Sequence, residues 1–265
     1  MKVKYIIAYI VVLSCNTPKQ LINTTGSSSN ITQNGKLYTA IFQQYAAEYR
    51  ALCFQAYNIA REKLDADLQK TSLHAPAIIT DIDETVLDNS PYAVHQALAS
   101  KDYDQNAWFN WTKLASADTV PGAPAFLKYA ASRNVEVFYI SNRDKSERAV
   151  TIQNLQKYGL PNADTSHVIL KEDSFSKEKR RNSVLNGHDV LLLLGDNLSD
   201  FSALFDRKSL DERYKNANST VNEFGNHFIV LPNPGYGDWE SAFFSHQLLT
   251  TSQKDSVIRK MLKSF

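Results

Sequence analysis

Short, uninterrupted apolar runs alternate along the chain with longer segments whose apolar residues recur at helical spacing. The run Ala77-Ile78-Ile79 is mostly β-branched, which is typical of a strand buried on both faces of a parallel sheet. Similar runs lie at 135–140, 167–170, 189–194 and 228–231. Helices are expected between them, at 123–133, 145–158 and 177–185. Strands that alternate with helices predict an α/β fold, with a Rossmann-like parallel sheet and helices on both faces.

Two further segments predict a smaller helical cap. Residues 37–70 contain no Pro or Gly, and their apolar residues recur at roughly helical spacing, which predicts one long helix. Residues 88–120 follow the first strand and are polar and aromatic, and Ser90-Pro91 is a typical helix start. We expect an inserted cap at about 88–120, to which parts of the helix at 37–70 contribute.

The N-terminal 14 residues have the layout of an export signal. Lys2 and Lys4 precede an apolar core that is too short to cross a membrane as a helix. The core ends in Val12-Leu13-Ser14-Cys15, which resembles a bacterial lipobox and implies cleavage before Cys15 and lipidation of its thiol. The alternatives are an ordinary signal peptide or a buried hydrophobic strand, and in either case Cys15 would have no special role.

The remainder of the chain divides into a tether and one main domain. Residues 15–35 are rich in Ser, Thr, Asn and Gln and predict a flexible tether, which would hold the domain off a membrane of the cell envelope. In a Gram-negative host this would be the outer membrane or periplasm. Residues 36–265 are long enough for one sizeable core with an insertion.

Composition excludes some classes of partner. The chain has 29 basic and 28 acidic residues and a net charge of +1, which disfavours a nucleic acid polymer as a partner. Its two cysteines, Cys15 and Cys53, provide no disulfide framework, and Cys53 is expected to be a small core residue. The sequence leaves open whether the chain is a monomer or a homodimer.

Two aspartates, Asp81 and Asp83, stand where the first strand ends. Side chains two residues apart share a face in an extended chain, and open α/β sheets bind ligands beyond the carboxyl ends of their strands. Two carboxylates this close repel unless a cation lies between them, and Mg²⁺ prefers oxygen ligands. A lone Asp-x-Asp would favour a simpler interpretation, in which one aspartate caps a turn and the other is solvated. A second acidic pair, Asp196 and Asp200, follows the run at 189–194 and favours a functional site.

Four motifs at strand ends carry a family resemblance. They are Asp81-Ile-Asp-Glu-Thr-Val-Leu-Asp-Asn, Ser141-Asn142, a lysine after the third strand and Gly195-Asp-Asn-Leu-Ser-Asp-Phe. In this order they resemble the motifs of the haloacid dehalogenase superfamily and, more narrowly, those of the class C acid phosphatases. These are bacterial lipoprotein phosphomonoesterases, and some are 5′-nucleotidases. The resemblance runs from about residue 37 to 239 and implies the haloacid dehalogenase core fold.

The resemblance implies roles for the four aspartates. Asp81 would be the nucleophile that forms an aspartyl-phosphate, and Asp83 would be the general acid and then the general base. Mg²⁺ would be held by the carboxylate of Asp81, the backbone carbonyl of Asp83 and Asp196. Asp200 would orient these ligands from behind.

The phosphate-binding residues follow in the same way. Ser141 would donate to a phosphate oxygen, helped by the Asn142 amide, although Ser141 alone also fits a helix N-cap. The catalytic lysine is either Lys171, at the end of its strand, or Lys177, at the start of the next helix. Family spacing favours Lys177, where a helix N-terminus also attracts anions.

Two aromatics are candidates for substrate recognition. By similarity to nucleotidase members of the family, Trp108 and Tyr236 would stack on a nucleobase. For Trp108, packing within the cap is equally compatible with the sequence. For Tyr236, the equally compatible alternative is a loop aromatic that shields the end of the sheet.

The sequence thus predicts a secreted, lipid-anchored, Mg²⁺-dependent phosphomonoesterase of small phosphate esters, with nucleoside 5′-monophosphates as expected substrates. A phosphotransferase that passes phosphate from Asp81 to an alcohol is one alternative. A non-catalytic binding lipoprotein with the same fold is another, and the intact pair Asp81 and Asp83 disfavours it. The lipobox disfavours a plant storage-type relative.

Overall fold

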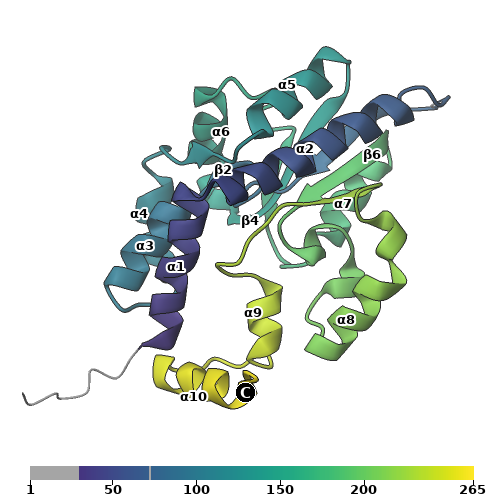
Figure 1. Cartoon of the computed structure of the whole chain (residues 1–265). Helices are drawn as coiled ribbons and strands as arrows, with labels where there is room; N and C mark the ends of the chain where they lie inside the picture. Colours follow the sequence, from purple (N-terminus) through teal and green to yellow (C-terminus); the bar gives the residue numbers. More distant parts are fainter. Residues whose placement is uncertain (1–29, 72) are drawn as a thin grey trace, which may run out of the picture.

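Five strands form one parallel sheet, with the order β5-β4-β1-β6-β7. In Figure 1 the strands lie at the centre of the molecule, among the helices. The computed structural model describes residues 30–71 and 73–265, so the expected export signal and most of the tether lie outside it. The strands are β1 (Ala75–Thr80), β4 (Glu136–Asp144), β5 (Val168–Lys171), β6 (His188–Gly195) and β7 (Phe228–Val230). All five runs predicted from the sequence are strands of this sheet, which confirms the expected α/β fold.

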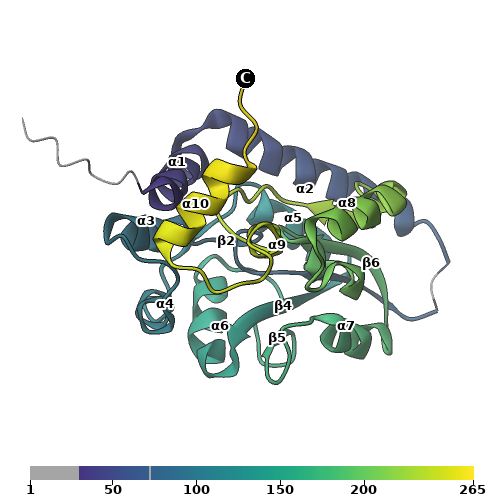
Figure 2. The ribbon, with the colours of Figure 1, turned by 90° about the horizontal axis from the view of Figure 1, so that it is seen from below.

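The two faces of the sheet pack against separate apolar clusters. Side chains alternate along β1, so Ile78 lies in the larger cluster and Ile79 in the smaller one. Three helices contribute side chains to the larger cluster, and their ribbons are seen from below in Figure 2. They are α2 (Ala47–Asp67), α5 (Ala123–Ser132) and α6 (Arg148–Lys157). The smaller cluster includes Val184 of α7 (Glu178–Leu185), on the other face.

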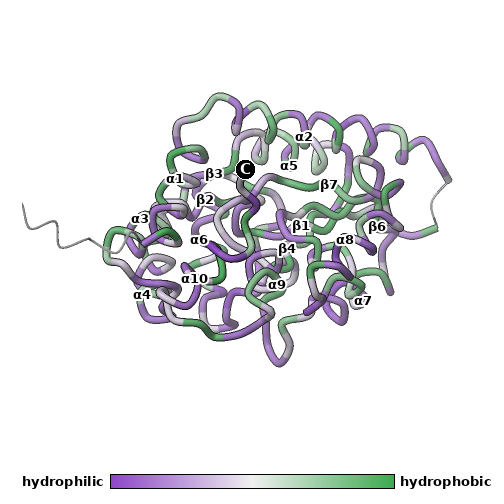
Figure 3. The backbone as a smooth tube through the Cα atoms, turned by 60° about the horizontal axis from the view of Figure 1, so that its bottom comes forward, coloured by the Kyte–Doolittle hydropathy of each residue, from purple (hydrophilic) through white to green (hydrophobic). Residues whose placement is uncertain are grey.

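Amphipathic helices supply these contacts. In Figure 3, α2 alternates between hydrophobic and hydrophilic positions along its length. Its apolar side carries Cys53 and Leu64, both fully buried. Cys53 is therefore the small core residue that was expected, and burial raises the pKa of its thiol to about 11.

The inserted cap is present. The short strands β2 (Leu87–Asp88) and β3 (Asp118–Thr119) pair antiparallel at its base. Between them lie α3 (Ser90–Leu98) and α4 (Gln105–Thr112). Helix α3 packs against α1 (Ile31–Tyr45), so the N-terminal segment contributes to the cap (Figure 1).

Two expectations for the N-terminal segment are wrong. The single helix predicted at 37–70 is divided at Ala46, whose backbone is extended, because α1 packs with the cap whereas α2 crosses the sheet. Helix α1 also begins at Ile31, so residues 31–35 belong to the folded domain and not to the tether. Thr32 and Gln33 of this first turn are buried.

A C-terminal helix that the hydrophobic pattern did not predict fixes the start of α1. In α10 (Thr251–Met261), Asp255 accepts hydrogen bonds from the backbone N–H groups of Ile31 and Thr32, each at 3.0 Å. Two more helices in this half of the chain are α8 (Leu210–Ser219) and α9 (Asp238–Phe243). Short 3₁₀ turns are η1 (Lys145–Glu147), η2 (Leu198–Asp200), η3 (Ala203–Phe205) and η4 (Val221–Glu223). Within residues 30–71 and 73–265, none of the helices has the length and apolar character of a membrane span.

Candidate active site

The loop after β1 places Asp81 and Asp83 at the carboxyl end of the sheet. Strand β1 ends at Thr80, so the two aspartates lie in a loop and strand alternation does not govern them. The backbone N–H of Asp81 donates to the carbonyl of Leu194 at 2.9 Å, which keeps this residue beside β6. The chain then turns back at Glu84, whose φ of 59° is in the left-handed region.

Lys177 joins two of the candidate carboxylates. Its ammonium group contacts Asp81 Oδ1 and lies 2.7 Å from Asp200 Oδ1, and all three side chains are buried. Lys177 immediately precedes α7, as the family spacing suggested. The alternative residue, Lys171, instead places its Nζ 4.4 Å from the ring centroid of Phe175. Of the two lysines, Lys177 is the one that the structure places in the site.

The loop after β6 brings in the second acidic pair. Asp196 accepts from Thr85 Oγ1 at 3.0 Å and from Asn233 Nδ2 at 2.8 Å. Asp200 Oδ2 accepts from the backbone N–H of Asn197 at 2.9 Å, which closes the loop around η2. A Cβ atom on Gly195 would lie 2.5 Å from Asp200 Cβ and Oδ2, so only glycine permits this close approach.

The carboxylates fit a divalent cation. Ligand oxygens of Asp81, Asp196 and Asp200 lie within 4.8 Å of one another, and Lys177 supplies a single positive charge against these three carboxylates. Burial raises the pKa of Asp81 to about 7 against the opposing effect of Lys177. Burial, reinforced by Asp200 and Asp81, also raises the pKa of Asp196 well above its usual range. A hard cation with oxygen ligands would offset this excess of negative charge.

The side chain of Asp83 lies outside this group of three carboxylates. It forms a salt bridge with Arg143, whose Nη2 is 2.7 Å from Asp83 Oδ1 and whose Nε is 3.0 Å from the same oxygen. Asn89 Nδ2 donates to Oδ1 at 2.8 Å, and Ser141 Oγ donates to Oδ2 at 3.3 Å. A role for the Asp83 backbone carbonyl as a cation ligand stays a prediction.

Sequence reasoning missed Arg143, although the signal was present. Ser141 and Arg143 are two residues apart in β4, and both are buried on the face toward Asp83. Asn142 lies between them and is exposed, and its side-chain oxygen accepts from Arg180 Nη2 at 2.6 Å. The Asn142 side chain therefore points away from Asp83, because neighbouring positions of a strand face opposite sides.

A buried acid beside the two aspartates was also missed. Glu84 accepts from the Asn89 backbone N–H at 2.8 Å and from the hydroxyl of Tyr236. Burial, and then the charge of Asp83, raise the pKa of Glu84 to about 8. This contact draws Tyr236, from the segment after β7, to the loop after β1, while 40% of its surface remains exposed.

Trp108 lies near Arg143, the partner of Asp83, and is largely covered. Only 8% of its surface is exposed, and its ring meets Tyr92 edge-on, with centroids 5.1 Å apart. The guanidinium carbon of Arg143 lies 5.5 Å from the Trp108 ring centroid. Trp108 is thus both a cap packing residue and a neighbour of the Asp83–Arg143 pair.

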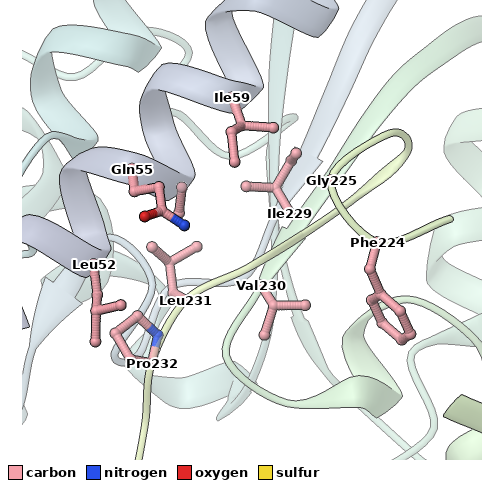
Figure 4. A pocket seen from close by; sticks show the side chains of 10 residues that line it. Leu52, Gln55, Ile59, Phe224, Gly225, Ile229, Val230, Leu231 and Pro232 are labelled. Atoms are coloured by element: carbon pink, nitrogen blue, oxygen red, sulfur yellow. The ribbon is translucent and has the colours of Figure 1, made fainter. Parts of the chain in front are cut away.

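An apolar pocket of about 300 Å³ is lined by a different set of residues (Figure 4). It is formed by α2 and the segment around β7, and it contains none of the residues discussed above. It is lined by Leu52, Gln55, Ala56, Ile59, Phe224, Gly225, Ile229, Val230, Leu231 and Pro232. Its walls offer no acid, base or nucleophile, so we place the candidate active site at the carboxylates.

Known proteins are similar to this chain in sequence and in fold. The family model described as HAD (haloacid dehalogenase) superfamily, subfamily IIIB (acid phosphatase), matches residues 8–239. The class C acid phosphatase from Bacillus anthracis superimposes with a TM-score of 0.85 and is 41% identical, over 89% of this chain and 99% of that chain. A structure of the same enzyme with tungstate bound gives the same values.

Three plant proteins are more distantly similar. Vegetative storage protein 1 from Arabidopsis thaliana is 29% identical over 46% of this chain and 47% of its own length. The stem 31 kDa glycoprotein of Glycine max is 23% identical, over 73% of this chain and 69% of its own length. Acid phosphatase 1 from Solanum lycopersicum is 25% identical over 46% of this chain and 50% of its own length. The chain therefore spans about half the length of the Arabidopsis and Solanum proteins.

Gly195→Ala is expected to destabilise the protein by about 1–3 kcal/mol, because the added methyl group must displace the Asp200 side chain. Urea denaturation gives the free energy of unfolding. Gly187→Ala is the matched control, since no atom lies within 4 Å of a Cβ at that position. Equal stability of the two variants would show that Asp200 does not need the close approach.

Proposed function

Because the chain belongs to the HAD superfamily, subfamily IIIB, of acid phosphatases, we propose that it is a Mg²⁺-dependent phosphomonoesterase that acts on small phosphate esters at the cell envelope. The resemblance seen in its motifs is thereby confirmed at the level of the family. The observation that carries the proposal is the buried group in which Lys177 contacts Asp81 and Asp200. The intact pair Asp81 and Asp83, with the expected roles of nucleophile and general acid, disfavours the alternative of a non-catalytic binding protein.

The first chemical step uses Asp81 and Asp83. A carboxylate oxygen of Asp81 attacks phosphorus, and the bond from phosphorus to the ester oxygen breaks. Asp83 gives its proton to the departing oxygen, so the product leaves as an alcohol. Lys177 donates to Asp81 and favours the ionised form that attack requires.

The second step releases phosphate. Asp83, now ionised, takes a proton from a water molecule, whose oxygen attacks the phosphorus of the aspartyl-phosphate. The bond to Asp81 breaks and its carboxylate is regenerated. Transfer to an alcohol in place of water would make the chain a phosphotransferase, the alternative reaction of the same intermediate.

Mg²⁺ would be held by Asp81, Asp196 and the backbone carbonyl of Asp83. The carboxylate oxygens of Asp200 instead contact Lys177 and the backbone N–H of Asn197. When bound, the ion would offset the negative charge of the carboxylates and of the transferring phosphoryl group. Ser141, at the end of β4, would donate to a phosphate oxygen, and a backbone N–H donor from Asn142 would assist. The tungstate in the Bacillus anthracis relative is a tetrahedral oxyanion like phosphate, which supports a phosphate site here.

Phosphate release from a simple ester in the presence of Mg²⁺ tests the proposal. We expect Asp81→Asn to lower the rate by about 10³-fold or more, because the variant lacks a nucleophile for the first step. Asp211→Asn, an exposed aspartate of α8, is the control and should retain the rate of the wild type.

The same assay tests the metal. Excess chelator should abolish turnover, and added Mg²⁺ should restore it. Undiminished turnover in chelator would contradict the metal requirement, whereas a wild-type rate in Asp81→Asn would contradict the nucleophile. The absence of phosphate release from the wild type would favour the binding-protein alternative.

Nucleoside 5′-monophosphates are the proposed substrates. Tyr236 has an exposed surface beside Glu84, and Trp108 lies near Arg143, the partner of Asp83. The two aromatics would flank a base whose 5′-phosphate reaches Asp81. Because Trp108 is mostly covered, Tyr236 would contribute the larger stacking surface.

Replacing the Tyr236 ring should remove the preference for a nucleotide. The reference substrate is ribose 5-phosphate, which has the same leaving group but no base. We expect Tyr236→Leu to lower the ratio of kcat/KM for a nucleoside 5′-monophosphate to kcat/KM for ribose 5-phosphate, by a factor that corresponds to about 1–3 kcal/mol of lost stacking free energy. Tyr236→Phe keeps the ring and should keep the preference. An unchanged ratio in Tyr236→Leu would exclude stacking at this position.

A lipid anchor at Cys15 is the proposed means of attachment, on the strength of the lipobox-like sequence before it. Cys15→Ser should shift the protein from the membrane fraction to the soluble fraction of cells. Cys53→Ala removes the other cysteine, which is buried, and should leave the protein with the membranes. Retention of Cys15→Ser in the membrane fraction would refute the anchor.

A further inference from the structure

Arg143 is a buried cation whose donors are directed at the proposed general acid. It is 4% exposed, and its Nη2 and Nε lie 2.7 and 3.0 Å from Asp83 Oδ1. Its Nη1 donates to Thr151 Oγ1 of α6 at 3.1 Å, and the Trp108 ring lies 5.5 Å from its guanidinium carbon. The guanidinium is therefore held from both the core and the cap.

We propose that Arg143 is a positioning residue for the reaction, which fixes the Asp83 carboxylate in the orientation needed for proton transfer. The inference rests on the proposed phosphomonoesterase function. Two of the three nitrogens of the guanidinium are committed to Asp83 and the third to Thr151. Arg143 thus acts through Asp83 rather than on the substrate.

The hydrogen bonds also distinguish the two oxygens of Asp83. Oδ1 receives three donors at 3.0 Å or less, two from Arg143 and one from Asn89. Oδ2 receives only longer contacts, at 3.2 Å from Arg143 Nε and at 3.3 Å from Ser141 Oγ. A saturated Oδ1 leaves Oδ2, which faces the expected phosphate-binding Ser141, as the oxygen that carries the proton.

The leaving group of the substrate reports on this role. An alkyl phosphate has a basic leaving oxygen and needs the proton from Asp83, whereas p-nitrophenyl phosphate has a stable leaving anion and does not. The value of kcat/KM covers the steps up to phosphoryl transfer to Asp81, so it isolates the step that needs the acid. A purely structural role of Arg143 would lower kcat/KM for both esters equally.

The experiment measures kcat/KM of Arg143→Met for ribose 5-phosphate and for p-nitrophenyl phosphate on the same preparation. We expect a loss of about 10²-fold or more with the alkyl ester and a much smaller loss with the aryl ester. Both esters are assayed with the same fraction of folded protein, so partial unfolding of the variant cancels from the ratio of the two kcat/KM values. Arg143→Lys keeps the charge but not the bidentate geometry and should fall between wild type and Arg143→Met.

Two controls make the outcome specific. Arg213→Met removes another buried arginine, which donates to the Phe205 carbonyl at 3.1 Å, and should leave the ratio of the two esters unchanged. Asp83→Asn should show the same selective loss as Arg143→Met, and the double variant should be no more selective than Asp83→Asn alone.

Three results would overturn the proposal. They are equal losses with both esters in Arg143→Met, a rise in KM without a change in kcat, and additive losses in the double variant. The last two would mean that Arg143 binds the substrate directly or acts independently of Asp83. A wild type that releases phosphate from neither ester would overturn the proposed function and this inference with it, whereas the three results above leave the function intact.

Discussion

The ammonium group of Lys177 is the charge on which the site depends. It contacts Asp81 and Asp200, which come from different loops, and no water layer separates the three side chains. Removing one partner of a buried ion pair leaves an uncompensated charge, so loss of Lys177 would leave the carboxylates of both loops without their partner. The parallel sheet makes this possible because the carboxyl ends of β1 and β6, adjacent strands, point the same way. Lys177, which immediately precedes α7, lies at that end.

Asp83 is held by a second network, on the side of β4. Arg143 pairs with its carboxylate while Lys177 pairs with that of Asp81, so two acids that are close in sequence have different cations. Each cation favours the ionised form of its carboxylate, which Asp81 needs for attack, and the two donors of Arg143 also orient Asp83 for its proposed role in proton transfer. The network reaches the cap through Trp108 and Asn89, so the position of the cap and the orientation of the acid are linked.

The cap is itself joined to the end of the chain. Asp102, between α3 and α4, lies 2.9 Å from Lys254 of α10 and 3.7 Å from Lys36 of α1. Partly exposed pairs of this kind contribute little energy individually, but here they connect three segments that are far apart in the sequence. Tyr236 adds a further link, from the C-terminal half to Glu84 beside the site. The region that surrounds the carboxylates is thus assembled from both ends of the chain.

The sequence by itself determined the sheet, the insertion and the acidic residues, because strand runs, turn residues and short motifs are local. It also favoured Lys177 over Lys171 through spacing. Tertiary structure decided what local pattern cannot express. The division of the predicted helix at Ala46 follows from packing with the cap, since periodicity continues through that residue and no Pro or Gly marks it. The pairing of Arg143 with Asp83, 60 residues apart, depends on the adjacency of β1 and β4. The burial that raises the pKa of Glu84 exists only after the loops have closed around it.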